Sequence, residues 1–246
     1  MELESAACKV DIPRLKTACS NCSLRELCMP VGLALEEIDL LDELVGGRRR
    51  VKRGDSVYRA GETFTALYAV RSGFFKTRLV ADDGRDQVTG FYMAGELLGM
   101  DGISQEQHNC DAVALEDSEI CMIPYARLEA LSQEVRSLQR HFHKVMSREI
   151  VRENGVMLLL GTMRAEERLA AFLLNISQRL HLRGYSALEF NLRMTREEIG
   201  SYVGLKLETV SRLFSRFHAE GLLEVDQRRV RIRDIEGLRA IYAHHT

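Results

Sequence analysis

Several features that mark other protein classes are scarce in this sequence of 246 residues. It contains three prolines, no tryptophan and a net charge of only −2. Its longest aliphatic run, Val156–Leu160, is too short to cross a bilayer. The N-terminus is acidic and lacks the apolar stretch of a secretory signal. With 46% hydrophobic and 28% charged residues, the composition is that of a globular protein. We therefore expect a folded, cytoplasmic protein with no membrane contact.

Residues 48–124 have the pattern of a β domain. Short runs rich in β-branched and aromatic residues alternate with glycine-containing turns, with no helical period between them. The expected strands are Ser56–Arg59, Phe64–Arg71, Phe74–Val80, Gln87–Tyr92, Val113–Leu115 and Glu119–Ile123. This pattern predicts an antiparallel β-sandwich or β-roll.

Histidine is nearly absent from this β domain, where His108 is the only one. A metalloenzyme built on a β-roll needs several His and carboxylate ligands, so no such site can form there. No supporting motif accompanies a nucleophile and base elsewhere in the chain. We predict that the protein is not an enzyme.

Residues 132–161 are predicted to form one long helix, since they contain no proline and only Gly155 in the interior. Along it, apolar residues and one acid recur at alternating steps of four and three, the period of a coiled-coil seam. These seam residues are Met146, Ile150, Glu153, Met157 and Leu160. Two interpretations are open: an amphipathic helix packed on its own domain, or the seam of a homodimer, which we favour.

The last third of the chain has the plan of a winged helix-turn-helix. The expected elements are a helix over Ala165–Leu182, a helix that begins at a Thr195–Glu198 capping box and breaks at Gly204, a helix over Leu207–Glu220, and a hairpin over residues 222–233. Basic residues outnumber acidic ones in this part. The pattern predicts a DNA-binding domain.

The exposed face of the helix over Leu207–Glu220 carries side chains that can read bases. Arg212 can donate twice to guanine, Glu208 can accept from cytosine, and Ser211 can serve either base. The alternative is an ordinary surface ion pair between Glu208 and Arg212, which are four residues apart. The side chains expected to contact phosphates are Lys206, Arg216, Arg228 and Arg229.

Six cysteines give the second functional signal, since clustered thiols in a reducing cytosol indicate metal binding or redox chemistry. Cys19, Cys22 and Cys28 lie within ten residues, which leaves one ligand missing from a tetrahedral or cubane site. Cys8, Cys110 and Cys121 are the candidates for the fourth ligand. Spacing does not separate zinc from an iron–sulfur cluster, although the single tight Cys pair slightly favours the cluster.

Four stretches together resemble the CRP/FNR superfamily of bacterial regulators, and within it the oxygen-sensing FNR (ANR) branch. They are the Cys19/Cys22/Cys28 group, Leu67–Gly73 with Ala94–Leu97, Ala165–Phe172 and Leu207–Leu213. The resemblance implies an α+β fold in four parts: a cluster-binding segment (1–30), a β-roll sensory domain (31–131), a dimerisation helix (132–161) and a winged helix-turn-helix (162–246).

The same resemblance implies one [4Fe–4S] cluster per subunit, held by Cys19, Cys22, Cys28 and Cys121, the last of which stands just before Met122-Ile123-Pro124. It further implies a global transcription regulator that dimerises and binds DNA without oxygen and releases DNA when oxygen degrades the cluster. The expected DNA sites are palindromes of TTGAT-like half-sites, read by Glu208, Ser211 and Arg212. The loop Ala81–Asp86 is expected to contact RNA polymerase.

Cyclic-AMP receptors of the superfamily hold the nucleotide phosphate with an Arg-Ser soon after Gly-Glu-Leu. Here Gly95-Glu96-Leu97 is present, but no arginine lies between Arg85 and Arg127. Because a buried phosphate needs its cation, no cyclic nucleotide is expected to bind. The alternative function that remains is a zinc-stabilised, constitutive DNA-binding regulator of the same superfamily.

Overall fold

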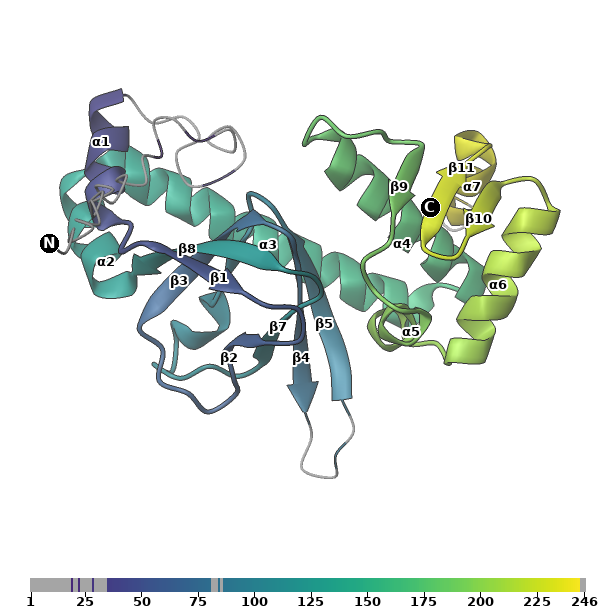
Figure 1. The fold of residues 1–246 in the computed structure, drawn as a ribbon, viewed down its shortest axis with the longest axis horizontal. Helices are drawn as coiled ribbons and strands as arrows, with labels where there is room; N and C mark the ends of the chain where they lie inside the picture. The colour runs from purple at the N-terminus through teal and green to yellow at the C-terminus, as the bar shows by residue number, and fades with distance from the viewer. Residues whose placement is uncertain are drawn as a thin grey trace, which may run out of the picture.

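The computed structural model describes Cys19, Cys22, Cys28, residues 35–80, Gly84 and residues 86–243. Its chain forms a β domain, a long helix and a C-terminal domain, drawn from purple to yellow in Figure 1. The predicted α+β fold is confirmed. Within this part of the chain, no helix is both long and apolar enough to span a membrane.

Two four-stranded antiparallel sheets form the β domain in the described chain. One has the order β1 (Arg48–Val51), β8 (Ser118–Pro124), β3 (Ala66–Ser72), β6 (Leu97–Leu98); the other has the order β2 (Ser56–Tyr58), β7 (Asp111–Ala114), β4 (Phe74–Val80), β5 (Asp86–Met93). Alternate side chains along the strands bury Val70, Phe75 and Ile120 in a shared core. A short 3₁₀ helix, Met100–Gly102, follows β6. The predicted β-roll is therefore present, with β1 and β6 as additional strands.

The predicted long helix is divided in the structure. Helix α2 (Tyr125–Glu134) ends at Val135, whose backbone is extended (φ −108°, ψ 93°), and α3 (Arg136–Thr162) begins at the next residue. The bend allows Leu128 of α2 and Leu138 of α3 to be buried in one core, together with Leu41 and Leu44 of α1 (Leu35–Leu44). The boundary predicted at residue 132 therefore falls inside α2, and the long helix begins at Arg136.

The C-terminal domain contains the predicted winged helix-turn-helix. Its elements are α4 (Ala165–His181), β9 (Glu189–Asn191), α5 (Arg196–Val203), α6 (Leu207–Ala219), β10 (Leu223–Asp226), β11 (Arg229–Ile232) and α7 (Ile235–Ala243). The capping box at the start of α5 is formed: Thr195 Oγ1 accepts from the Glu198 backbone N–H at 3.1 Å. Gly204 ends α5 with φ 66°, a conformation that favours glycine. Strand β9 completes a three-stranded wing sheet that sequence patterns did not predict.

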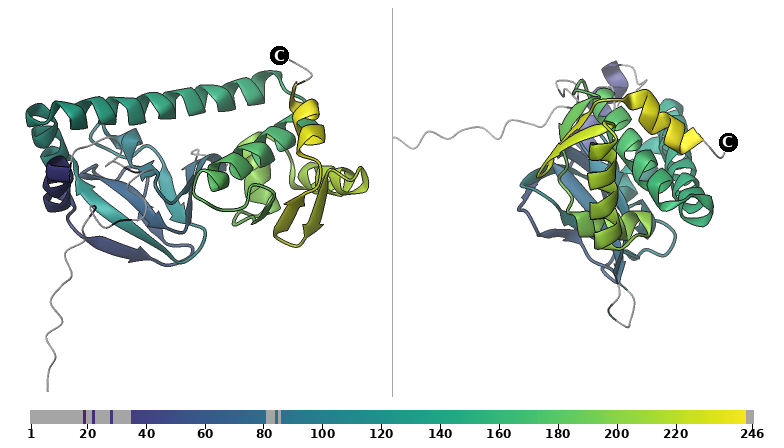
Figure 2. Two further views of the ribbon diagram at one scale, coloured as in Figure 1. Left: turned by 90° about the horizontal axis from the view of Figure 1, so that it is seen from above. Right: turned by 90° about the vertical axis from the view of Figure 1, so that its right-hand side faces the viewer.

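Helix α3 runs along one side of both domains, as the left panel of Figure 2 shows. Beneath it, a group of ionic contacts joins the β domain to α4. Glu96 accepts from Arg179 Nη2 at 2.5 Å and from Arg183 Nη2 at 2.7 Å. The same two arginines also donate to the backbone carbonyls of Phe91 and Ala94, both at 2.6 Å. The C-terminal domain is therefore fixed to the β domain by charged, largely buried contacts.

A second junction connects the β domain to α5, the helix that precedes α6. Lys76 Nζ lies 2.8 Å from Glu198 Oε1, and the Val88 backbone N–H donates to Ser201 Oγ at 2.8 Å. Beside them, the rings of Phe91 and Tyr202 are 5.1 Å apart. Because α5 packs directly on α6, these contacts determine how α6 is oriented relative to the β domain.

Candidate functional site

Four of the six cysteines share similar surroundings in the structure. Cys19, Cys22, Cys28 and Cys121 are half-buried free thiols. Cys121 lies in β8, directly opposite Arg48 of β1 and Ala69 of β3. Cys28 and Cys121 contribute to the raised pKa of Cys19, Cys22 contributes to that of Cys121, and Cys28 and Cys121 pack against the same hydrophobic core. The fold thus brings the three N-terminal cysteines to the sheet that carries Cys121.

The other two cysteines have different positions. Cys110 is buried in the core between the two sheets, and its Sγ lies 3.4 Å from Asp101 Oδ2. Burial, then the carboxylate of Asp101, raises the pKa of Cys110 well above its usual range. The largest contributions to this shift come from burial, Asp101, Tyr58 and Asp111. Cys8 lies outside the described residues.

Burial also controls the protonation of the cysteine group. It is the main reason why the pKa of Cys19 lies well above its usual range, and the nearby carboxylate of Asp42 adds to the effect. Burial raises the pKa of Cys121 to about 11, although the guanidinium of Arg71 opposes the shift. Both are therefore protonated thiols at neutral pH, and binding of a metal or cluster must release their protons.

In the described part of the chain, no three His, Cys, Asp or Glu side chains are arranged to hold a single metal ion. The donor set of four thiols nevertheless has the chemistry of an iron–sulfur ligand set, since such clusters are bound by four thiolates. The half-burial of all four thiols also suits a site that is partly shielded from solvent.

The cysteine group is attached to two helices. The Cys19 backbone N–H donates to Asp42 Oδ1 on α1, and Ser137 of α3 donates to Glu37 of α1. His141 of α3 is buried and hydrogen-bonds to the backbone of Cys28. The positions of Cys19 and Cys28 are therefore coupled to those of α1 and α3.

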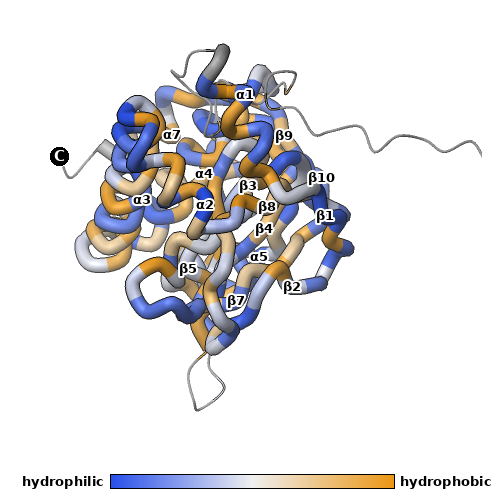
Figure 3. The backbone as a smooth tube through the Cα atoms, turned by 90° about the vertical axis from the view of Figure 1, so that its left-hand side faces the viewer, coloured by the Kyte–Doolittle hydropathy of each residue, from blue (hydrophilic) through white to orange (hydrophobic). Residues whose placement is uncertain are grey.

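Only part of the predicted seam of α3 is exposed to solvent. Ile150 and Met157 are 58% and 69% exposed, and Glu153 between them is also exposed. Met146 packs against the β-domain core, and Leu160 packs against the core of the C-terminal domain. Val151 and Leu158 add exposed apolar surface that the seam pattern did not include. Figure 3 shows hydrophobic stretches of α3 on the outside of the molecule.

The recognition helix α6 has one buried and one exposed face. Val210, Leu213, Phe214 and Phe217 are buried. Glu208, Ser211 and Arg212 are exposed, as predicted for base contacts. No ion pair joins Glu208 to Arg212 in the described structure, so the surface-pair alternative is not realised. Both side chains remain available to a partner.

The side chains predicted to contact phosphates surround this face. Lys206, the residue before α6, is exposed. Arg216 pairs with Glu220 at 2.7 Å and with Glu166 at 3.1 Å. Arg229 of β11 pairs with Glu189, and Arg228 in the turn before β11 donates weakly to the Arg193 carbonyl at 3.4 Å. These pairs are exposed, so they contribute little stability and can be exchanged for phosphate contacts.

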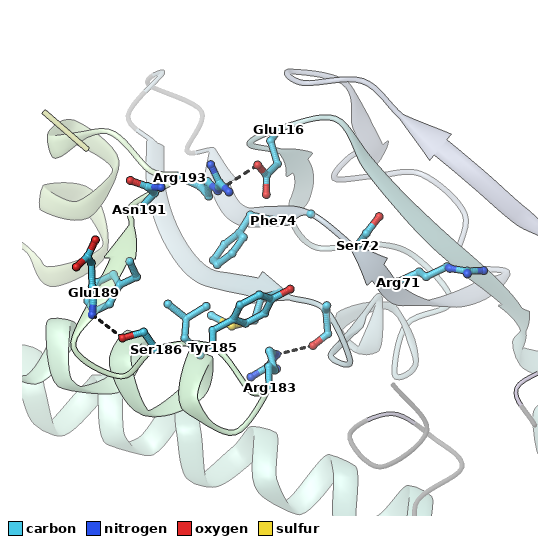
Figure 4. A pocket seen from close by; sticks show the side chains of 15 residues that line it. Arg71, Ser72, Phe74, Glu116, Arg183, Tyr185, Ser186, Glu189, Asn191 and Arg193 are labelled. Carbon is cyan, nitrogen blue, oxygen red and sulfur yellow. Dashed lines mark hydrogen bonds and ion pairs between the residues drawn. The ribbon is translucent and has the colours of Figure 1, made fainter. Parts of the chain in front are cut away.

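Two cavities lie next to these elements. One of about 530 Å³ lies between the β domain and α3; the described residues that line it include Asp101, Glu149 and Glu153 but no Lys or Arg. The other, of about 440 Å³, lies between the two domains and is shown in Figure 4. There Arg193 pairs with Glu116 at 3.1 Å, while the side chain of Arg71 extends away from the cavity.

Together, the β-roll, the helix α3 and the winged helix-turn-helix define the architecture of a DNA-binding regulator. Comparisons with known proteins agree with this class. Residues 48–135 match the cyclic nucleotide-binding domain family, and residues 167–241 match the Crp-like helix-turn-helix domain family.

Among curated proteins, the chain is 50% identical over 223 residues to the transcriptional regulatory protein btr of Bordetella pertussis, covering 91% of this chain and 92% of that protein. It is 44% identical to the transcriptional activator protein anr of Pseudomonas aeruginosa, covering 88% of each. It is 40% identical to the fumarate and nitrate reduction regulatory protein of Salmonella typhimurium, covering 92% of this chain and 90% of the relative.

Among solved structures, FixK2 from Bradyrhizobium japonicum matches with a TM-score of 0.76 and 29% identity, covering 82% of this chain and all of that chain. The chain therefore belongs to the CRP/FNR family of transcriptional regulators, in its FNR/ANR group. It is a DNA-binding transcription regulator rather than an enzyme.

Proposed function

We propose that this regulator responds to oxygen through a [4Fe–4S] cluster held by Cys19, Cys22, Cys28 and Cys121, one per subunit. The observation that supports the proposal is that all four thiols are half-buried and that Cys28 and Cys121 pack against one core, whereas Cys110 lies in another. When bound, the cluster supplies oxygen-sensitive chemistry and a covalent cross-link between the four cysteines. The names of the anaerobic relatives support the same function.

The chain's own residues suggest how the cysteine segment controls dimerisation. Asp42 holds the backbone of Cys19 from α1, and His141 holds the backbone of Cys28 from α3. A change in the cysteine segment therefore acts on the N-terminal half of α3. The exposed residues Ile150, Glu153 and Met157 lie roughly two and a half to four and a half turns beyond His141 on the same helix.

The proposed dimer pairs α3 with its copy through the seam of Met146, Ile150, Glu153, Met157 and Leu160. Exposure of Ile150 and Met157 favours pairing, while two Glu153 carboxylates facing each other oppose it. The dimer presents two α6 helices to successive major grooves, as palindromic TTGAT-like half-sites require. Lys206, Arg216, Arg228 and Arg229 then contact the backbone.

The cavity between the β domain and α3 supports our proposal that no cyclic nucleotide binds. Among the described residues, its lining carries carboxylates from Asp101, Glu149 and Glu153 and no Lys or Arg, and the adjacent Arg152 is already paired with Glu149. A phosphate would therefore be buried next to like charges. A contact of the loop Ala81–Asp86 with RNA polymerase also remains our proposal. Residues 81–83 and 85 lie outside the described part of the chain.

The test is a series of single cysteine-to-serine variants, reconstituted with iron and sulfide without oxygen. Loss of iron, sulfide and visible absorption is expected for Cys19, Cys22, Cys28 and Cys121. Cys110→Ser is the matched control, since Cys110 is equally reduced but lies in a different core. A full cluster in Cys121→Ser, or stoichiometric zinc in the anaerobically purified protein, would contradict the proposal.

A further inference from the structure

Arg71 has an unusual position next to the cysteine group. It is the extra residue of a β-bulge in β3, where the register with β8 shifts between Val70 and Ser72. Its Nε lies 3.1 Å from Glu119 Oε2, and Glu119 stands two residues before Cys121 in β8. Residues two apart in a strand share a face, so Arg71, Glu119 and Cys121 lie on one side of the sheet.

The guanidinium of Arg71 is only partly satisfied. Its Nη1 is buried and has no hydrogen-bond partner among the residues that the structure describes. An unsatisfied buried donor costs about 1–3 kcal/mol, and more when it is charged. The charge of this group also lowers the pKa of Cys121. The free N–H is therefore buried on the face of the sheet that also carries the expected fourth ligand, two residues along β8 from Glu119.

A protonated thiol is a weak hydrogen-bond acceptor, whereas a thiolate or a sulfide in a cluster is anionic and accepts from a guanidinium strongly. Four thiolates on an iron–sulfur core also leave a net negative charge that a nearby cation offsets. Arg71 thus offers a ligand thiolate both a positive charge and a hydrogen-bond donor from outside the ligand set. Glu119 holds its Nε, which fixes the direction of the remaining donors.

We propose that Arg71 is a positioning residue that donates its Nη1 hydrogen to sulfur at the Cys121 corner of the cluster and so slows cluster loss. The inference rests on the proposed function, because it requires that a cluster be held there. It assigns to the bulge in β3 a role beyond the shape of the sheet.

The experiment compares anaerobically reconstituted wild type with Arg71→Gln, Arg71→Lys and Glu119→Gln. The matched control is Arg78→Gln, since Arg78 is also a strand arginine paired with acids but lies in the other sheet. Iron and sulfide content, the iron–sulfur stretching frequencies in resonance Raman spectra and the rate of iron loss to a ferrous chelator are measured without oxygen. Thermal melting of the cluster-free proteins reports the fold.

Arg71→Gln is expected to lose iron roughly tenfold faster than wild type, the lower end of the effect of removing an outer-shell partner. It should also shift the stretching frequencies, because a hydrogen bond to sulfur is lost. Arg71→Lys should lie between the two, and Arg78→Gln should match wild type. If cluster-free Arg71→Gln has a lower melting midpoint than cluster-free wild type, the rate of iron loss is compared between wild type and Arg71→Lys instead.

Wild-type rates and frequencies in both Arg71 variants would overturn the inference. So would equal acceleration in Arg71→Gln and Glu119→Gln with unchanged stretching frequencies, since Arg71 would then act only by holding the bulge. A wild-type protein that assembles no cluster would refute the proposed function instead, so the two failures are distinguishable.

Discussion

The ionic contacts of Glu96 allow a quantitative prediction for the junction between the two domains. Glu96 pairs with Arg179 and Arg183, whose side chains are 14% and 7% exposed. Replacing Glu96 by Gln keeps the shape of the side chain but leaves two largely buried guanidinium groups without their counter-charge. Removing one partner of a buried pair costs about 3–5 kcal/mol. Because Glu96 itself is partly exposed, we expect about 2–4 kcal/mol.

The same substitution predicts a pH dependence. Burial acts to raise the pKa of Glu96, but Arg179 and then Arg183 outweigh it and hold this pKa below the usual 4.5. A carboxyl with a lowered pKa stabilises the folded state above its unfolded pKa and loses that contribution as the pH falls through the folded value. The stability difference between wild type and Glu96→Gln should therefore be complete above pH 5 and shrink below pH 4.

Thermal melting and hydrogen exchange of Ala94–Leu98 and of the C-terminal half of α4 measure the effect. A loss of this size lowers the midpoint by roughly 5–15 °C for a chain of this length. Glu116→Gln is the matched control, because its contact with Arg193 also joins the two domains but is 3.1 Å long and more exposed. Equal midpoints and exchange rates for Glu96→Gln and Glu116→Gln would refute the reasoning.

Three further predictions concern DNA, dimerisation and ligand. Arg212→Ala should cost about 1–3 kcal/mol of binding free energy on a palindromic site and relax the preference for one guanine, whereas Arg228→Ala should weaken binding to all sequences alike and lower the dependence of affinity on salt. Fluorescence anisotropy on specific and random DNA separates the two effects. An equal loss of affinity on both DNAs for Arg212→Ala would exclude base readout. Glu153→Ala should strengthen dimerisation of the cluster-free protein by about 1–2 kcal/mol, because it removes two opposed carboxylates; an unchanged constant in analytical ultracentrifugation would place Glu153 outside the seam. Millimolar cyclic AMP should leave the melting midpoint unchanged, and a clear upward shift would contradict the acidic lining of the cavity.

Local sequence signals predicted most of the elements that they specify directly. The capping box at Thr195, the turn at Gly204 and the buried face of α6 each depend on residues a few positions apart, and each is present in the structure. Strands β6 and β9, two and three residues long, carry too little pattern to be detected. They form because they pair with the strands β3 and β11.

The division of the long helix shows why tertiary packing limits such predictions. Nothing in the residues around Val135 forbids a helix, and the bend arises because Leu128 and Leu138 are buried in the same core. Long-range contacts of single charged residues were likewise invisible in the sequence. The pairing of Glu96 with Arg179 and Arg183, and the buried N–H of Arg71, required the positions of strands and helices far apart in the chain.

The most direct test of the central claim follows one anaerobically reconstituted sample as air is admitted. Visible absorption reports the cluster, sedimentation reports the dimer, and anisotropy of a labelled palindromic TTGAT-containing duplex reports DNA binding. The three signals should be present together without oxygen and should decay together in air, while Cys121→Ser shows none of them at the start. DNA binding and dimerisation that persist unchanged after the absorption has disappeared would contradict the account.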